Sequence, residues 1–454
     1  MPTGEGERWA VVGGGMLGIT LALRLAESGR RVVLFEASDR LGGLAEPWRL
    51  PIPGEADVVW DRHYHVTLST DAALLALLDE LGLRADVRWA PTRTGMVADG
   101  RLLPVSGVRD FLKLPHLSPV AKARLGATLL AGSRIKDWHK LENMTAEAWL
   151  TTWSGASTFR AFWIPLLRAK LGDAWHETNA AFVWATIQRL ASARSTGGLQ
   201  ERFGYVPGGY ATVLERATSK LAECGVDLVL GAPVREIHPT SAGLEVRSGE
   251  RSETVDGVAV TTDAHVAAAM CGSLTPSETE QLLALRYQGV VCASVVLARP
   301  IGPYYLTYLF DDAPFTAVVE MSTLVASSEL HGRSLVYLPK YVSEGDPMFD
   351  EDDAVIEESF LAALDGKYPA FDRSDVLAFR VSRARRVFPI ATLGYSHHIP
   401  PFDTSTPGLH LVMSAQICNG TLNVNETIEL GERAARHLLA QSSPVPSGPP
   451  AVSP

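Results

Sequence analysis

The stretch AVVGGGMLGITLALRLAESGRRVVLFEASDRLGG, residues 10–43, decides the fold class. An apolar run leads into three glycines, and Leu17, Leu21 and Leu25 then follow at the spacing of one helix face. Gly29 ends this segment, and the apolar run RVVLFE comes next. This order predicts a strand, a glycine turn, a helix and a second, buried strand, which together form a parallel βαβ unit.

The glycines of that unit have the spacing of a dinucleotide-binding turn, Gly13-x-Gly15-x-x-Gly18. Gly13 makes the tight turn, Gly15 lets the backbone approach a pyrophosphate, and Gly18 lets the helix pack closely on the strand. The pyrophosphate lies at the helix N-terminus, where free N–H groups and the helix dipole favour an anion. Met16 and Leu17, in the first turn of the helix, are therefore included among the predicted cofactor contacts.

A carboxylate follows at the end of the second strand. Glu36 can accept hydrogen bonds from ribose hydroxyls at this position, and it would repel a 2′-phosphate. NADP is thereby disfavoured. Glu36 and its neighbour Ala37 are predicted to bind the cofactor.

The composition narrows the class of function further. The 454-residue chain is 46% hydrophobic and has a formal net charge of −10, which argues against a nucleic-acid partner. The four cysteines lie far apart without a CxxC pair, so we expect a reducing, cytoplasmic compartment and neither a zinc cluster nor a redox disulfide. No apolar run approaches the roughly 20 residues that a membrane span requires.

Strand and helix patterns predict two interleaved domains. The dinucleotide-binding domain is assembled from three separate segments, 8–90, 203–287 and 389–440. The substrate domain comprises residues 91–202 and 288–388, and residues 108–200 are expected to form a mostly helical layer.

Three finer expectations concern single segments. The strands VDLVL (226–230) and PVREIH (233–238) are expected to return to the nucleotide-binding sheet. Residues 71–81 are expected to form a helix with Asp71 as its N-cap. The Pro/Ser/Gly-rich termini, 1–7 and 441–454, are predicted to be disordered.

A basic residue and a second glycine pair follow the carboxylate in SDRLGGLA (38–45). They resemble the extended FAD signature of the amine oxidase superfamily, which implies that Arg40, Gly42 and Gly43 contact the pyrophosphate side of FAD. FGYVPGGYATVLERATSKLAECGVDLVLGAPVREI (203–237) resembles a second motif of that superfamily, in which the valine matching Val234 meets the adenine. GLHLVMSAQICNGTLNVNETIELGERAA (408–435) resembles its C-terminal flavin-binding segment.

On these three motifs the chain is identified as a member of the FAD-dependent amine oxidase superfamily, in the branch of protoporphyrinogen oxidase and the phytoene desaturase-like enzymes. The resemblance implies an α/β fold with a Rossmann-like FAD-binding domain built from discontinuous segments. It also implies an interleaved α+β substrate domain that includes a helical layer, and a non-covalently bound FAD.

Two departures from the superfamily pattern narrow the chemistry. Where most members end the C-terminal strand in Gly-Asp, this chain has Met413 and Ser414, and the serine hydroxyl can replace one hydrogen bond to the ribityl chain. Backbone N–H groups at the start of the following helix are expected near flavin N1 and O2, from residues Asn423, Val424 and Asn425.

The second departure is the lysine that amine oxidases place near flavin N5. The matching strand has Cys292, Ala293 and Ser294 instead, so an amine-oxidase mechanism loses support. There is no second GxGxxG for a nicotinamide cofactor. Oxygen, a quinone or another small acceptor is therefore expected to take the electrons.

The loop WDRHYHVTL (60–68) matches the place where related branches carry a histidine against the flavin ring. His63 and His65 are candidates for proton transfer, because imidazole titrates near neutrality, and Arg62 is a candidate cofactor contact. The alternative is that both histidines pack against the flavin and satisfy backbone groups.

Charged residues elsewhere suggest where a substrate binds. WIPLLRAKLGD places Arg168 and Lys170 at a helix end that lines the substrate cavity in related proteins, with Lys170 a candidate catalytic group. Arg383 and Arg385 share one face of a predicted strand. Together with Tyr395 they are candidates for binding an anionic substrate. The alternative for the two arginines is a solvated edge strand paired with the acids of DEDD.

The favoured hypothesis is an FAD-dependent oxidoreductase that removes hydride from a carbon centre of a small-molecule biosynthetic intermediate, by oxidation, dehydrogenation or desaturation. The alternative is a redox-neutral flavoenzyme similar to UDP-galactopyranose mutase, acting on an anionic sugar nucleotide. Residues 108–132 resemble the segment through which some relatives with apolar substrates touch bilayers, so membrane contact is expected to be at most peripheral.

Overall fold

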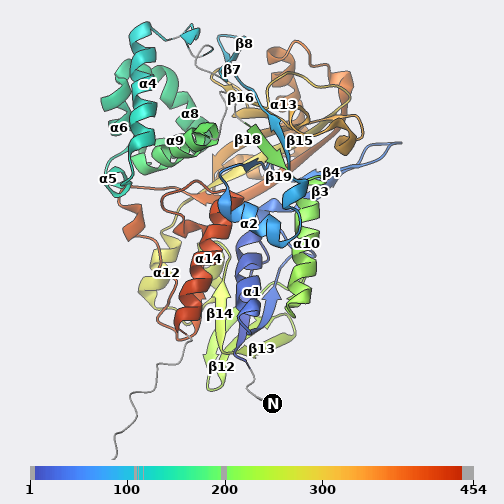
Figure 1. Ribbon diagram of the computed structural model, residues 1–454, viewed down its shortest axis with the longest axis vertical. Coiled ribbons are helices and arrows are strands. Elements are labelled where there is room, and N and C mark those ends of the chain that lie inside the picture. Colours follow the sequence, from blue (N-terminus) through green and yellow to red (C-terminus); the bar gives the residue numbers. More distant parts are fainter. Residues whose placement is uncertain (1–5, 107–109, 111, 116, 196–201, 442–454) are drawn as a thin grey trace, which may run out of the picture.

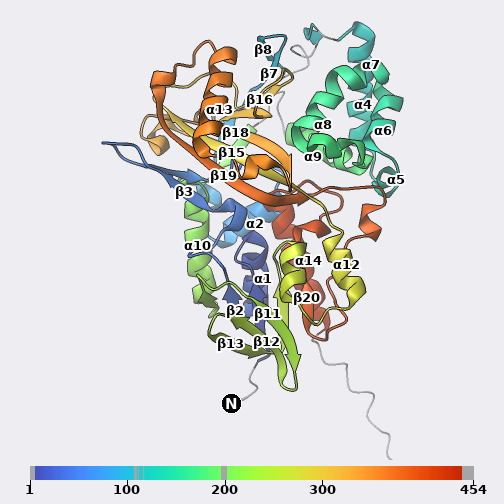
Figure 2. The same ribbon diagram turned by 180° about the vertical axis from the view of Figure 1, so that it is seen from behind.

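The computed structural model describes residues 6–106, 110, 112–115, 117–195 and 202–441. Of the segments predicted to be disordered, residues 1–5 and 442–454 lie outside this part of the chain. Glu7 lies inside it, and its carbonyl accepts a 3.0 Å hydrogen bond from the Arg31 backbone. Figures 1 and 2 show a lower half built around one parallel sheet and an upper half with a second sheet beside a group of helices.

The lower half contains the predicted βαβ unit, formed by β1 (Arg8–Val12), α1 (Met16–Glu27) and β2 (Arg31–Phe35). β1 and β2 pair in parallel, and their apolar residues are almost entirely buried. Gly29 follows the helix with φ +88°, a backbone conformation that glycine adopts without strain. The pattern of residues 10–43 therefore predicted this unit correctly.

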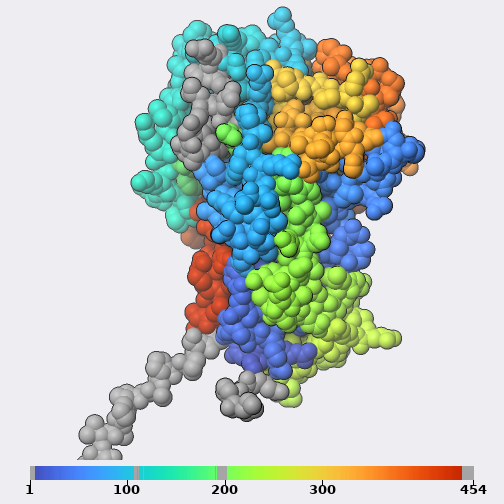
Figure 3. Space-filling view, turned by 45° about the vertical axis from the view of Figure 1, so that its right-hand side comes forward, coloured from blue at the N-terminus to red at the C-terminus, as the bar shows by residue number. Residues whose placement is uncertain are grey.

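The complete lower sheet has the strand order β10-β2-β1-β14-β20, and all its neighbours are parallel. Its other strands come from the middle and the end of the chain: β10 (Asp227–Val229), β14 (Gly257–Val260) and β20 (Leu409–Leu411). Segments far apart in sequence thus form one sheet, and Figure 3 shows blue, green and red segments side by side on the surface of this half.

Helices cover one face of this sheet, and they are α1, α2 (Ala72–Glu80), α10 (Gly209–Glu223) and α14 (Val424–Gln441). A Cβ added to Gly431 would lie 3.0 Å from the Thr20 side chain, so a small residue is needed where α14 crosses α1. This close approach explains why the buried residues Gly431, Ala434 and Ala435 are small.

The opposite face corrects one expectation. PVREIH does not join the parallel sheet, because β11 (Glu236–Thr240) pairs antiparallel with β12 (Gly243–Ser248), which pairs with β13 (Arg251–Val255). This small sheet covers the second face together with α11 (Ala264–Met270) and α12 (Pro276–Leu283). The apolar residues of this small sheet pack on the parallel strands. A strand that packs on a sheet and a strand that pairs within it show the same alternation of apolar residues, so the sequence could not distinguish the two.

The upper sheet has the order β19-β15-β18-β17-β16-β7-β8. Its strands are β7 (Thr94–Ala98), β8 (Arg101–Pro104), β15 (Tyr287–Leu297), β16 (Leu306–Leu309), β17 (Ala317–Glu320), β18 (Ser334–Ser343) and β19 (Val376–Pro389). α13 (Asp353–Lys367) covers one face, and the other face packs against β3 (Pro47–Leu50) and β4 (Val58–Asp61). The long strand β15 is fully buried, because it contributes side chains to both faces.

Helices form the remaining part of the upper half, as the sequence predicted. They include α4 (Pro119–Arg134), α5 (His139–Glu142), α6 (Ala146–Ser154), α8 (Ile164–Leu171) and α9 (Ala180–Ser195), with a π-helical turn at Phe159–Trp163. Tryptophans 149, 163, 175 and 184 are buried together in this layer. A further small sheet, β5-β9-β6, is formed by β5 (Thr67–Leu68), β9 (Arg202–Tyr205) and β6 (Arg88–Pro91).

Candidate functional site

The glycine turn has the geometry that an anion site needs. Gly13 has φ +112°, and a Cβ added to Gly18 would lie 1.8 Å from the Gly13 carbonyl oxygen. A Cβ added to Gly15, by contrast, would meet no protein atom within 4 Å. Gly13 and Gly18 are therefore required by the fold itself, whereas Gly15 faces open space at the N-terminus of α1, where Met16 and Leu17 begin the helix.

The second glycine pair packs directly against the first turn. The Gly42 N–H donates a 2.9 Å hydrogen bond to the Gly14 carbonyl, and a Cβ on Gly43 would lie 3.2 Å from the Gly15 Cα. Arg40 is largely exposed, and its guanidinium is 3.0 Å from Asp39 and 3.5 Å from Glu46. Glu46 in turn lies 2.9 Å from Arg62, so the two predicted cofactor-binding arginines share one carboxylate beside the glycines.

Glu36 lies over the turn, at the end of β2. One carboxylate oxygen accepts a 2.6 Å hydrogen bond from the Gly14 N–H, and the other accepts from the Ser38 N–H at 2.9 Å and its hydroxyl at 2.8 Å. The backbone carbonyl of Glu36 accepts a 2.9 Å hydrogen bond from the Ala232 N–H. This bond brings the segment with the buried Val234 close to Glu36 and Ala37. Ser38 was not singled out from the sequence.

The start of α14 also lies in this half, and two asparagine side chains there cap two different helices. The Asn423 side chain accepts a 3.1 Å hydrogen bond from Glu426 N–H and so caps α14. The Asn425 side chain accepts from Ala73 N–H at 2.9 Å and from Leu74 N–H at 3.1 Å, so it caps α2 instead. The first backbone N–H groups of α14, at Val424 and Asn425, precede the helix's own hydrogen bonds.

Asp71 is consequently not the side-chain cap of α2. Its carboxylate accepts a 2.8 Å hydrogen bond from Leu68 N–H and lies 2.9 Å from the guanidinium of Arg189 on α9. Asp71 thus joins the lower half to the helical layer, because a buried carboxylate is stabilised better by a cation than by a helix end alone.

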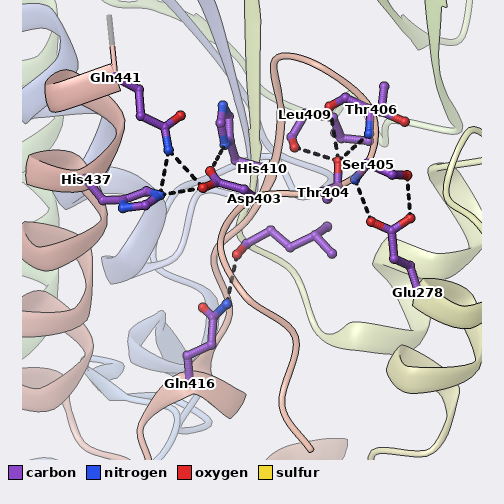
Figure 4. Close-up of polar contacts among 11 residues, drawn as sticks. Glu278, Asp403, Thr404, Ser405, Thr406, Leu409, His410, Gln416, His437 and Gln441 are labelled. Carbon is purple, nitrogen blue, oxygen red and sulfur yellow. Dashed lines mark hydrogen bonds and ion pairs between the residues drawn. The ribbon is translucent and has the colours of Figure 1, made fainter. Parts of the chain in front are cut away.

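The Ser414 turn after β20 is held by Gln416, which was not singled out from the sequence. Its side chain accepts a 2.9 Å hydrogen bond from Met413 N–H and donates at 3.0 Å to the carbonyls of Pro400 and Leu411. Figure 4 shows one of these Gln416 bonds below a second cluster, in which Asp403 contacts His410 and His437. The two clusters fix the C-terminal segment between β20 and α14.

Tyr395 belongs to this support. It is buried, and its hydroxyl donates a 2.8 Å hydrogen bond to the Ala415 carbonyl, next to Ser414. The Tyr395 hydroxyl therefore holds the backbone of the flavin-motif segment, and its role as a substrate contact stays a prediction.

The loop after β4 brings His63 to the upper sheet. His63 Nε2 is 3.3 Å from the Ser382 hydroxyl on β19, and Ser382 pairs with Cys292 on β15. Burial, with smaller contributions from His65 and Arg62, lowers the pKa of His63 to about 3. His63 therefore stays neutral at physiological pH.

His65 has different neighbours. Its Nδ1 is 3.8 Å from the buried Asp61 carboxylate, and its ring lies 5.0 Å from that of Tyr210. Asp61 also accepts a 2.8 Å hydrogen bond from Tyr210 N–H, at the start of α10. His65 thus contacts the junction of β4 and α10, which favours the packing interpretation for this residue.

Lys170 projects from the end of α8 into an aromatic environment. Its ammonium is 3.9 Å from the ring centroid of Tyr341 and 4.7 Å from that of Phe388. The Tyr341 hydroxyl is 3.0 Å from that of Tyr64, the residue after His63. Burial lowers the pKa of Lys170, and burial raises the pKa of Tyr341 to about 12.

The structure thus brings together two predicted catalytic residues that are far apart in sequence. We call the group of His63, Tyr64, Lys170, Tyr341 and Ser382 the aromatic chamber. It lies beside Cys292, on the strand where the superfamily resemblance places the position near flavin N5. Tyr341 and Ser382 were missed, because alternation along a strand does not indicate which strand faces a site. Tyr64, in the loop after β4, was not singled out although it stands between the two candidate histidines.

The predicted arginine site is corrected. Arg383 lies 2.5 Å from the Asp353 carboxylate, and Arg385 lies 2.5 Å from that of Asp350. β19 is the edge strand of its sheet, so the acid-paired alternative describes these arginines. Arg168 is exposed on α8, two residues from Lys170 and therefore on a different face of the helix.

Some predictions concern features beyond this site. Part of the predicted membrane-contact segment, at residues 107–109, 111 and 116, lies outside the described residues. In the described part of the chain, no helix is long and apolar enough to span a membrane. The same residues contain no group of His, Cys, Asp or Glu side chains that could hold a metal ion.

A parallel sheet with a glycine turn at its first helix and a carboxylate at the end of its second strand defines a dinucleotide-binding protein. The model of the flavin containing amine oxidoreductase family matches residues 17–439. The chain therefore belongs to this family, which confirms the resemblance seen in the three motifs.

Individual relatives are more distant. Putrescine oxidase from Kocuria rosea is 29% identical over 275 residues, which cover 55% of this chain and 52% of that protein. Protoporphyrinogen oxidase 2 from Arabidopsis thaliana is 35% identical over 80 residues, 18% of this chain and 15% of that protein. The chain spans 52% to 60% of the length of the first curated relatives it matches.

Solved structures share the fold over nearly the whole chain. A reduced UDP-galactopyranose mutase has a TM-score of 0.73 at 16% identity, and the match covers 96% of both chains. At this identity the likeness shows the fold alone, which confirms the predicted α/β class with its parallel sheet.

Proposed function

We propose that the protein is an FAD-dependent oxidoreductase that removes hydride from a carbon centre of a small-molecule biosynthetic intermediate. The observation that carries this proposal is the position of the aromatic chamber beside Cys292, at the strand that the family motif places near flavin N5. Oxygen or a quinone is the proposed electron acceptor, and the four free cysteines support a reducing, cytoplasmic compartment.

The residues of the lower half fit a non-covalent FAD. Open space at Gly15 and the backbone of Gly42 and Gly43 would receive the pyrophosphate. Glu36 would bind the ribose, and the Val234 segment would meet the adenine. The Ser414 hydroxyl and the N-terminus of α14 would hold the flavin end, where the positive end of the helix dipole favours added negative charge.

FAD, when bound, supplies the hydride acceptor. The chain must then remove one proton for each hydride that leaves the substrate, so that a C–H bond and a neighbouring O–H, N–H or C–H bond are both lost. Neutral His63, whose Nε2 lies beside the Ser382 hydroxyl, is the proposed acceptor of this proton, because an imidazole accepts a proton in its neutral form.

Two measurements test the proposal. Acid precipitation of the purified protein should release FAD, identified by chromatography against FMN and NAD standards. Anaerobic mixing of the oxidised holoenzyme with candidate substrates should bleach the flavin absorbance, and oxygen or a quinone should restore it. A colourless protein, or one that holds FMN or NAD alone, contradicts the cofactor. Turnover that needs prior reduction and yields an isomer of equal mass contradicts oxidation and supports the mutase-like alternative.

A further inference from the structure

Lys170 differs from Arg24, another partly buried cation, in what surrounds its charge. Arg24, for comparison, lies 2.7 Å from each of three carboxylates, on Glu27, Glu80 and Glu432. Within the described residues, no carboxylate forms an ion pair with Lys170, and the titratable group that acts on its charge is the Tyr64 phenol. In the described part of the chain the ammonium is therefore set against aromatic rings and not against a carboxylate.

Two aromatic rings lie against this ammonium, and further rings belong to the same apolar cluster. Beyond Tyr341 and Phe388, the ring of Phe182 lies 6.3 Å from Phe388, and Phe162 lies 5.8 Å from Phe310. Phe162 belongs to the π-helical turn that precedes α8, a local geometry that is frequent at functional sites. A ligand that reaches Lys170 past these rings would contact apolar, aromatic surface.

A desolvated cation is costly unless it is paired, and ring faces recover part of that cost. An anion that binds beside Lys170 recovers more, because the attraction between opposite charges is strong where water is excluded. The Tyr64 and Tyr341 hydroxyls lie 3.0 Å from one another beside the ammonium, and both stay protonated at neutral pH, so they can donate to the same anion.

Resting on the proposed function above, we propose that Lys170 binds an anionic oxygen group, a carboxylate or a phosphate, on a substrate whose body is apolar and ring-bearing. The guanidinium groups of Arg383 and Arg385 are paired with acids of residues 350–353, so the anion site is in the chamber and not on β19. The substrate class is thus an amphiphilic organic acid or phosphate ester.

Binding of model compounds to the holoenzyme tests this proposal without any turnover. 2-Naphthoate, 2-naphthyl phosphate and neutral 2-naphthamide are titrated separately by calorimetry. We expect one of the two anions to bind at least tenfold more tightly than the amide, and the preferred anion shows which group the site takes. Equal affinity for all three compounds would overturn the proposal.

Variants assign the effect to the side chain. Lys170→Met should weaken the preferred anion by tenfold or more and leave the amide unchanged, whereas Lys170→Arg should keep most of the affinity. Lys140→Met, a change at an exposed lysine of the same helical layer, is the matched control and should bind as wild type does. Loss of the amide together with the anion in Lys170→Met, at full FAD content, would contradict a charge-specific role.

Proton uptake provides an independent readout. Because burial lowers the pKa of Lys170 and an anion raises it again, anion binding should take up protons as the pH rises toward the pKa of the free lysine. Calorimetry in two buffers of different ionisation enthalpy measures this uptake, which should vanish in Lys170→Arg. Uptake that persists in the arginine variant would overturn the assignment. FAD release and flavin bleaching are measured separately, so failure of the proposed function is distinguishable from failure of this one.

Discussion

The glycine turn and the aromatic chamber achieve recognition in opposite ways. The turn is made from one continuous stretch, residues 13–43, and backbone atoms fill it so closely that a methyl group on Gly18 would overlap the Gly13 carbonyl. The chamber takes single side chains from distant elements, and its groups are distinguished by shifted pKa values. The comparison teaches that the cofactor half is sensitive to added volume, whereas the substrate half is sensitive to charge.

The largest expected effect tests the sensitivity of the glycine turn to added volume. Gly18→Ala should cost about 4 kcal/mol of unfolding free energy, because the new Cβ would lie 1.8 Å from a backbone oxygen and α1 must move off β1. Urea unfolding monitored by circular dichroism measures the change. A variant as stable as wild type would show that the turn is not closely packed.

In the aromatic chamber, the corresponding substitution removes the imidazole that is proposed to accept the substrate proton. His63→Ala should lower turnover by about 10²- to 10⁴-fold while FAD content stays near that of wild type. Steady-state rates are compared at equal flavin absorbance, with His65→Ala as the matched control, since His65 packs at the Asp61 junction instead. A drop of less than a few-fold would mean that His63 serves packing.

Gly15 faces open space, so a substitution there separates an effect on FAD binding from an effect on packing. Gly15→Ala should leave stability within about 0.5 kcal/mol of wild type, because its backbone, at φ −73°, suits alanine and its Cβ meets no protein atom within 4 Å. FAD affinity should fall about tenfold or more, since the methyl occupies the proposed path of the pyrophosphate. Equilibrium dialysis against FAD checks this, and unchanged affinity would refute the proposed position of the pyrophosphate.

Acid stability tests the electrostatic side of the comparison. The pKa of His63 falls from its usual 6.5 to about 3 on folding, so the unfolded chain binds a proton first as the pH falls. The contribution of His63 to stability is complete above pH 6.5 and is lost progressively down to pH 3, and the loss reaches about 2 kcal/mol at pH 5. His63→Gln should flatten the unfolding free energy over this window, and an unchanged slope would contradict the desolvation of His63.

The smallest effect belongs to the corrected arginine pair. Arg383→Ala should change stability by less than about 1 kcal/mol and leave anion binding unaltered, because an exposed ion pair with Asp353 contributes little. The same naphthoate titration provides the measurement. A tenfold loss of anion affinity would return the anion site to β19.

The sequence predicted those features that local chemistry determines. Gly13, Gly15, Gly18 and Glu36 follow a fixed spacing along one βαβ unit, so their positions follow from the order of residues alone. Lys170 was singled out, but its environment was not, because the rings of Tyr341 and Phe388 reach it through packing between strands β18 and β19 and helix α8.

Competition between partners explains the errors. Asp71 stands at the N-cap position of α2, but the Asn425 amide, 352 residues away from Ala73, takes that role, and Asp71 pairs with Arg189. Arg383 and Arg385 do share a strand face, yet they pair with acids just before and at the start of α13. The sequence shows which charged and polar residues are available as partners. It does not give the distances between residues that are remote along the chain.

Because the lower sheet is built from separate segments of the chain, its strands are synthesised at different times. β1, β2, β10 and β14 are all made before residue 261, but β20 follows only after the upper sheet has been completed. At about 5–20 residues per second, a ribosome needs roughly 7–30 s to pass from β14 to β20. During that interval β14 is an uncovered edge, because its partner β20 has not yet been made. A chain stopped before β20 is expected to retain no FAD, and an intermediate with this open edge is the form of the protein most exposed to misassembly.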